Sequence, residues 1–166
     1  MDNLSHLDTL QRLGLSLLAG LMLGFEREWS AKAAGLRTHA LVCEGSALFM
    51  MASLLIGEQV RRSGGAGYDP SRVASTVVQG IGFLAGGVIL ARGGRVHGIT
   101  TAADIWVTAA IGVLIGAGFF FLAIAATVTT VLVLGPLNWL ESRMTPRIRF
   151  SRMRNAETAG DEPDGE

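Results

Sequence analysis

The fold of this chain is decided by residues 102–139, which read AADIWVTAAIGVLIGAGFFFLAIAATVTTVLVLGPLNW. Asp104 is the only charged residue in this stretch. A membrane-spanning helix needs about 20 mostly apolar residues, so the stretch is too long for one span and long enough for two. Gly116-Ala117-Gly118 provides a natural break, which predicts an antiparallel pair of helices at residues 101–117 and 119–139.

Three more apolar stretches precede this pair and predict helices at residues 7–25, 38–57 and 73–90. The predicted fold class is therefore all-α. It is a polytopic membrane protein with five transmembrane helices in a glycine-rich bundle, and this domain covers residues 1–142. Residues 143–166 are first basic and then acidic, with Gly and Pro and no apolar core, and are expected to form a disordered cytoplasmic tail.

The composition agrees with a membrane protein. Of the 166 residues, 49% are hydrophobic and 17% are charged, whereas soluble domains carry about 25% charged residues. The charges collect in short clusters between the apolar stretches. Cys43 is the only cysteine, which excludes an intramolecular disulfide and makes a cysteine-based metal site implausible. We expect no cofactor and no nucleic-acid partner.

The placement of basic residues predicts the orientation, because cytoplasmic segments of membrane proteins are rich in Arg and Lys. One side of a five-span protein would hold Arg27, Lys32, Arg37, Arg92, Arg95, Arg143, Arg147, Arg149, Arg152 and Arg154. The other side would hold only Arg12, Arg61, Arg62 and Arg72. The first side is therefore predicted to be cytoplasmic, with the N-terminus outside. Trp29, Trp106 and Trp139 fall near the cytoplasmic interface, and the five tail arginines are expected to bind lipid headgroups.

Glycines spaced four residues apart occur in three of the predicted helices. Lipid provides no hydrophobic force between helices, so close approach of backbones through small residues matters. The pairs are Gly20/Gly24, Gly82/Gly86 and Gly112/Gly116, and the third helix adds Gly80 and Gly87. We expect these glycines to pack the bundle together, and a homo-oligomer interface is the alternative.

Glu44 is an ionisable residue inside the second predicted helix. Such a residue costs at least about 2.5–3.5 kcal/mol on insertion scales, which makes it a candidate for function. Arg37 lies seven residues earlier on the same helical face. Two interpretations stay open: a structural ion pair or a protonated carboxyl bonded to a neighbouring helix, and an ion-coordinating or proton-handling group.

Further polar residues are predicted at the cytoplasmic face. They are Glu26-Arg27-Glu28, Arg37-Thr38-His39 and Asp104, which we expect to converge at a shallow pocket. Carboxylates together with hydroxyls can bind Mg²⁺, so a magnesium site is possible at Glu44 or Asp104. Asp104 also has a structural interpretation, because Thr101-x-x-Asp104 has the form of a capping box and Thr100 and Thr101 are candidate N-caps.

The sequence offers no catalytic constellation. Ser46 and His39 do not define a triad, and there is no H-E-x-x-H motif or phosphate-binding loop. We therefore expect a protein that is not an enzyme and has no catalytic residues.

Several of these segments resemble the MgtC/SapB family of bacterial inner-membrane proteins. The matching segments are GLRTHALV at 35–42, GIGFLAGGVIL at 80–90 and GITTAADIWVTAAIG at 98–112, and Glu26-Arg27-Glu28 is similar to the first helix of the family. The resemblance covers roughly residues 10–140. It implies a five-helix hydrophobic domain with an outside N-terminus, and a link to growth in low Mg²⁺, survival inside macrophages and acid stress.

For the virulence branch of the family, the resemblance also implies a regulatory role through other membrane proteins, such as the F-type ATP synthase. Many virulence members carry a soluble C-terminal domain, for which the residues after Glu141 leave no room. In that branch asparagine and cysteine stand at the places of Thr100 and Val107. The sequence is therefore more similar to the short, general branch.

The expected function is that of a non-enzymatic inner-membrane protein in Mg²⁺ or acid-stress homeostasis, which modulates a partner membrane protein. The alternative is a Mg²⁺ or proton transporter or channel formed by an oligomer. A third interpretation, based on the arginine-rich tail, is a lipid-interacting structural protein.

Overall fold

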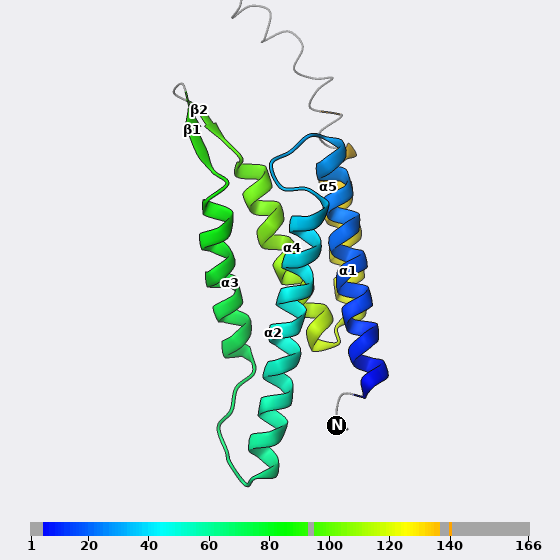
Figure 1. Cartoon of the computed structure of the whole chain (residues 1–166), viewed down its shortest axis with the longest axis vertical. Coiled ribbons are helices and arrows are strands. Elements are labelled where there is room, and N and C mark those ends of the chain that lie inside the picture. Colours follow the sequence, from blue (N-terminus) through cyan, green and yellow to red (C-terminus); the bar gives the residue numbers. More distant parts are fainter. Residues whose placement is uncertain (1–4, 93–94, 137–139, 141–166) are drawn as a thin grey trace, which may run out of the picture. The chain divides into compact units, whose positions relative to one another are not determined.

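The computed structural model describes residues 5–92, 95–136 and 140, in which five helices and one short hairpin are found (Figure 1). The elements are α1 (His6–Trp29), α2 (Leu36–Arg62), α3 (Ser71–Gly86), β1 (Leu90–Arg92), β2 (Arg95–His97), α4 (Ile99–Ala117) and α5 (Phe120–Leu134). The all-α class with five helices is confirmed. Trp139 and the tail arginines Arg143, Arg147, Arg149, Arg152 and Arg154 lie outside the described residues.

The chain divides into two compact units, residues 1–131 and 132–166. The first unit contains α1 to α4, the hairpin and most of α5. In this unit α3 and the hairpin lie on one side of α2, and α1 lies on the other (Figure 1). The contacts described below all belong to the first unit.

The ends of the helices differ from the predicted ones, most clearly in α3. This helix ends at Gly86 rather than Leu90, because the chain then enters an antiparallel hairpin in which Leu90 pairs with His97. Residues 87–90 are also apolar or small, so the apolar stretch in the sequence continues past the end of the helix. The sequence Gly93-Gly94 between the strands is nevertheless a dipeptide typical of hairpin turns.

Two of the three glycine pairs let helices approach the backbone of α2. A Cβ added at Gly20 would lie 2.6 Å from the carbonyl oxygen of His39, and one at Gly24 would lie 2.6 Å from Cα of Leu36. On α4, a Cβ at Gly116 would lie 2.5 Å from the carbonyl oxygen of Ala47, and Gly112 faces the backbone of Cys43 in the same way. Each contact needs a residue without a side chain.

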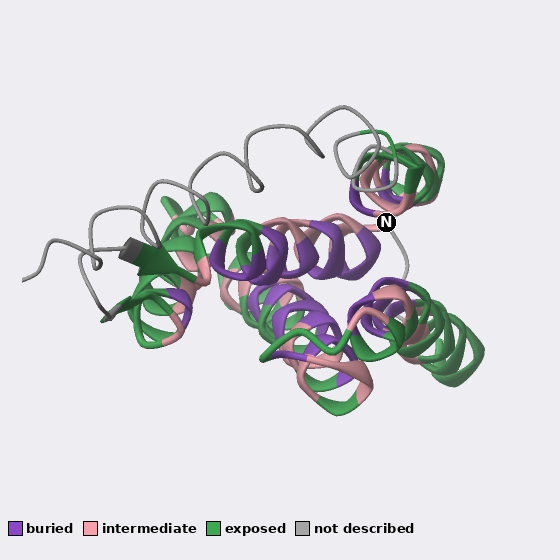
Figure 2. Cartoon of the chain, turned by 90° about the horizontal axis from the view of Figure 1, so that it is seen from above, coloured by how far each residue is buried: buried purple, intermediate pink, exposed green. Residues whose placement is uncertain are grey.

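The glycines of α3 do not make such contacts. A Cβ added at Gly80, Gly82 or Gly86 would meet nothing within 4 Å in the described part of the chain, and one at Gly87 would meet only the preceding turn. The prediction that Gly82 and Gly86 pack helices together inside the chain is therefore wrong. Figure 2 shows that the buried residues lie mainly on the sides of the helices that face other helices.

The outer surfaces of the helices are apolar. Phe83 is 89% exposed and Phe121 is 87% exposed, and such large exposed apolar surfaces indicate contact with a membrane or with protein partners. Within the described residues, α2 and α4 are long and apolar enough to cross a membrane. The shorter apolar helix α5 has 15 described residues.

Candidate functional site

The candidate site begins with a buried arginine at the end of α1. Arg27 follows Gly20 and Gly24 at spacings that place all three residues on one side of the helix. That side faces α2, and only 2% of the Arg27 side chain is exposed. A charged side chain buried to this extent needs a compensating charge.

Asp104 and His39 provide the centre of the site. Nε2 of His39, on α2, lies 2.9 Å from Oδ2 of Asp104, on α4, and neither side chain is exposed. Nε of Arg27 lies 3.8 Å from the same Oδ2 atom. Three helices thus meet at one carboxylate oxygen. The Thr108 hydroxyl donates to the backbone carbonyl of Asp104 at 2.8 Å, one turn further along α4.

The two hydrogen bonds of His39 require one proton more than a neutral imidazole and an ionised Asp104 carboxylate carry together. Its Nδ1 lies 2.9 Å from the carbonyl oxygen of Gly35, which can only accept, so Nδ1 carries a hydrogen. A hydrogen bond between Nε2 and Oδ2 then needs a second proton, on either the imidazole or the carboxyl group. With His39 as an imidazolium, the charges of Glu26, Arg27, His39 and Asp104 sum to zero.

The two glutamates that flank Arg27 have different roles. Nε and Nη2 of Arg27 bond to the carboxylate of Glu26, which also accepts a hydrogen bond of 2.9 Å from the Ser30 hydroxyl. The carboxylate of Glu28 accepts from the backbone N–H of Leu36 at 3.2 Å. Since α2 has no side-chain cap of its own at Gly35, Glu28 places a negative charge at the start of this helix.

The capping-box interpretation of Asp104 is wrong. The N-cap of α4 is Gly98, which has φ of 88° and no side-chain hydrogen bond, so the helix begins before Thr100 and Thr101 can act as caps. Thr100 is exposed and Thr101 is buried within the first turn. The carboxylate of Asp104 instead reaches across to α2. Of the residues expected to converge, Glu26, Arg27, His39 and Asp104 do meet, but Arg27, His39 and Asp104 are buried rather than open to a shallow pocket.

The remaining candidate residues lie outside the buried cluster, which consists of Arg27, His39 and Asp104 together with Glu26. Glu44 is half-buried on α2, and neither a hydrogen bond nor an ion pair joins it to any residue that the structure describes. Arg37 is exposed and Thr38 is half-buried near the start of α2. Trp106 is 47% exposed on α4, so its indole faces outward rather than toward Asp104.

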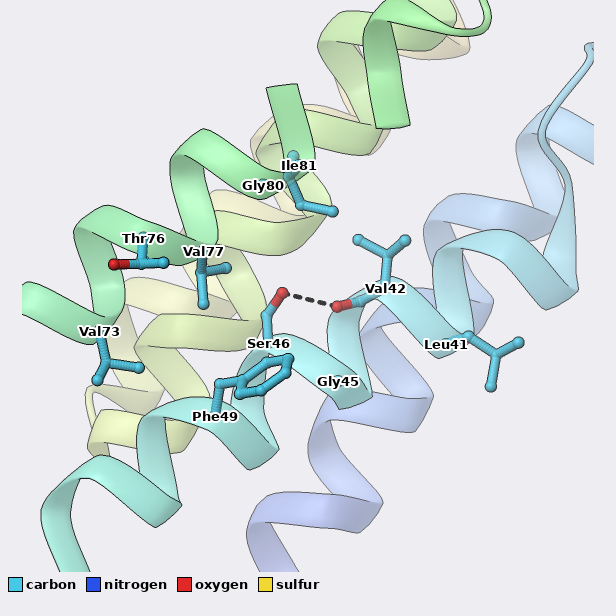
Figure 3. Close-up of a pocket in the computed structure, with 10 residues that line it drawn as sticks. All are labelled: Leu41, Val42, Gly45, Ser46, Phe49, Val73, Thr76, Val77, Gly80 and Ile81. Carbon is cyan, nitrogen blue, oxygen red and sulfur yellow. Dashed lines mark hydrogen bonds between the residues drawn. The ribbon is translucent and has the colours of Figure 1, made fainter. Parts of the chain in front are cut away.

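An apolar groove of about 570 Å³ separates α2 from α3 (Figure 3). Its lining includes Phe49, Val77 and Ile81, and its only polar side chains are the hydroxyls of Ser46 and Thr76. The Ser46 hydroxyl donates to the carbonyl of Val42 at 2.8 Å, as the dashed line shows. None of the residues that line the groove is charged, and most of its lining is apolar.

The described residues do not provide an obvious metal centre. They contain no group of three or more His, Cys, Asp or Glu side chains arranged to hold a metal ion. Within the same residues Oδ1 of Asp104 has no hydrogen-bond partner, but Nε of Arg27 lies 3.8 Å from Oδ2 of this carboxylate, and its positive charge opposes a cation at this place. Mg²⁺ at Glu44 or Asp104 remains a prediction.

Comparison with known proteins assigns the chain to a family. The model of the MgtC family matches residues 13–143, which include every residue of the buried cluster. The chain belongs to the MgtC family. No solved structure matches it.

Two relatives illustrate the extent of the similarity. YhiD of Escherichia coli (strain K12) is 48% identical over 133 residues, which cover 80% of this chain and 62% of YhiD. Protein MgtC of Salmonella typhimurium is 43% identical over 113 residues, which cover 68% of this chain and 45% of that protein. The chain thus spans only part of the length of these MgtC-family relatives.

Sequence reasoning identified the members of the cluster but missed how they pair. Glu44 was the clearest candidate because it interrupts an apolar stretch, whereas the structure joins His39 to Asp104, which are 65 residues apart. The available signal was that both residues lie in segments that resemble the MgtC family, near the start of predicted helices that run in the same direction.

Proposed function

We propose that this chain is a non-enzymatic, multi-pass protein of the bacterial inner membrane that acts in Mg²⁺ or acid-stress homeostasis by modulating a partner membrane protein. The N-terminus would lie outside, and the buried cluster would lie at the cytoplasmic side. Membership of the MgtC family supports the link to magnesium, because the name of YhiD provisionally assigns that relative to magnesium transport.

The main observation behind the proposal is that the cluster is closed to solvent and that its charges compensate one another. His39 and Asp104 are fully buried, and Arg27 is nearly so. An ion path needs charged or polar groups that water and ions can reach, whereas these groups are buried and bind to one another and to the helix backbone. The cluster is therefore suited to hold α1, α2 and α4 in fixed positions. A bundle fixed in this way can present a defined surface to a partner.

The rival function is a Mg²⁺ or proton transporter formed by an oligomer. It is favoured by one observation, the half-buried Glu44, which lies on an apolar helix without a partner in the described part of the chain. A carboxylate in such a place is costly unless it has a role. In an oligomer it could face a second copy and line a shared path.

A flux experiment separates the two functions. We expect the purified protein in liposomes to give Mg²⁺ and proton fluxes equal to those of empty liposomes, because the cluster is closed. Dyes for Mg²⁺ and pH inside the liposomes provide the measurement, and circular dichroism shows that the protein is folded. Flux that is present in the wild type and absent in Glu44→Gln would establish the transporter and overturn the modulator.

The modulator is tested directly by capture from native membranes. We expect the full chain, cross-linked in cells grown at low Mg²⁺, to recover a specific membrane protein. An F-type ATP synthase is one candidate. Recovery of the same background proteins as an unrelated five-helix membrane protein would count against the proposal.

A further inference from the structure

A second charged site lies far from the buried cluster, at the turn between α4 and α5. Nη1 of Arg12, on α1, donates to the carbonyl oxygen of Gly116 at 2.5 Å. Cζ of Arg12 lies 5.9 Å from the ring centroid of Phe120, which is within cation–π range. Gly116 belongs to the last turn of α4, where unpaired carbonyls and the helix dipole favour a cation.

These contacts do not use all the donors of Arg12. Nε is buried without a hydrogen-bond partner, and no hydrogen bond joins Nη2 to any residue that the structure describes. A guanidinium has five N–H donors in a planar fork that matches the oxygens of a phosphate. The side chain is only half-buried, so an anion can approach it from outside.

An apolar groove begins beside this guanidinium. It has a volume of about 200 Å³ and lies between α1 and α5, where Leu15, Leu18 and Met22 face Ile124 and Val128. Phe120 belongs both to the lining of this groove and to the contact with Arg12. The positive group of Arg12 thus contacts a residue that lines this groove, and the walls of the groove are almost entirely apolar.

Arg12 lies at a position along α1 where it can contact a lipid headgroup. Arg12 lies fifteen residues before Arg27, which corresponds to about 22 Å along a helix axis. Since the cluster with Arg27 lies near one membrane surface in the proposed topology, Arg12 lies toward the opposite leaflet. A phosphate there would be at the interface, and a chain in the groove would lie in the hydrocarbon.

We propose that Arg12 and the groove between α1 and α5 bind one phospholipid. The phosphodiester accepts hydrogen bonds from the guanidinium of Arg12, and one acyl chain lies along the groove. This site depends on the helices crossing a membrane, but it is independent of whether the protein modulates a partner or transports an ion.

The test measures lipid retention by native mass spectrometry of the full chain in detergent. Phosphatidylglycerol is compared with an uncharged glycosyl diacylglycerol that has the same acyl chains. We expect the wild type to prefer the phospholipid about fivefold, since a basic residue near a membrane surface contributes about 1 kcal/mol. Arg12→Gln should abolish this preference, and Arg12→Lys, which keeps the charge but not the planar fork, should retain only part of it.

Two further variants complete the experiment. Arg61→Gln is the matched control, because Arg61 is 69% exposed at the far end of α2 and is bound to Glu58, so the preference should not change. Ile124→Trp should fill the groove and weaken both lipids alike; Ile124 is 57% exposed, which leaves room for the larger ring.

Three outcomes would overturn the site. The first is an unchanged preference in folded Arg12→Gln, and the second is unchanged retention of both lipids in Ile124→Trp. The third is cross-linking that places a second copy of the chain in the groove. Should Arg12→Gln fail to fold, because it also loses the bond to Gly116, then Arg12→Lys and Ile124→Trp decide the question.

Discussion

Replacing Asp104 by alanine is expected to lower the free energy of unfolding by about 3–5 kcal/mol, the usual cost of removing one partner of a buried ion pair. The change leaves Nε2 of His39 buried without its acceptor and removes a carboxylate 3.8 Å from Nε of Arg27. Titration with sodium dodecyl sulfate from mild detergent, followed by circular dichroism, measures the loss.

Two variants show whether the loss comes from the pair itself. Thr100→Ala, on the same turn of α4 but exposed, should change stability by less than about 0.5 kcal/mol. The double variant His39→Phe with Asp104→Leu should recover much of the stability, because apolar groups of similar size often replace a buried ion pair without loss. A loss below about 1 kcal/mol in Asp104→Ala would mean that the cluster does not hold the helices together.

Replacing Gly112 by leucine is expected to cost about 3 kcal/mol, at the upper end of the usual cost of overpacking. The new side chain would meet the backbone carbonyl of Cys43 and Cβ of Ser46, which lies 2.8 Å from an added Cβ. A backbone carbonyl inside a helix cannot move aside as a flexible side chain can. Helices α2 and α4 would therefore separate, and the same titration would detect the loss.

Gly82→Leu is the matched control, since an added Cβ at Gly82 meets nothing within 4 Å in the described residues. It should leave the free energy of unfolding unchanged or raise it slightly, because leucine is more favourable than glycine inside a helix by up to about 1 kcal/mol. Size-exclusion chromatography of the same variant tests the homo-oligomer alternative. If an oligomer dissociates in Gly82→Leu, the outer face of α3 is its interface; equal losses in Gly112→Leu and Gly82→Leu would contradict the packing described here.

The sequence by itself predicted the number of helices, and its longer set of candidate residues included those of the cluster. Each helix follows from an apolar stretch that can be recognised on its own, although among the described helices only α2 and α4 are long and apolar enough to cross a membrane. The break between α4 and α5 at Gly118 could also be predicted from the local sequence, because its φ of 88° is a conformation that favours glycine. The segments around His39 and Asp104 resemble the family, which placed both residues among the candidates.

Only the tertiary structure decided which of these residues meet. The pairing of His39 with Asp104 depends on the distance of closest approach between α2 and α4, which Gly112 and Gly116 set far from the pair itself. Likewise, the spacing of Gly82 and Gly86 is identical to that of Gly20 and Gly24, and yet only the second pair faces another helix. Spacing along one helix fixes which residues share a face, but the rotation of that helix against its neighbours is a property of the whole bundle.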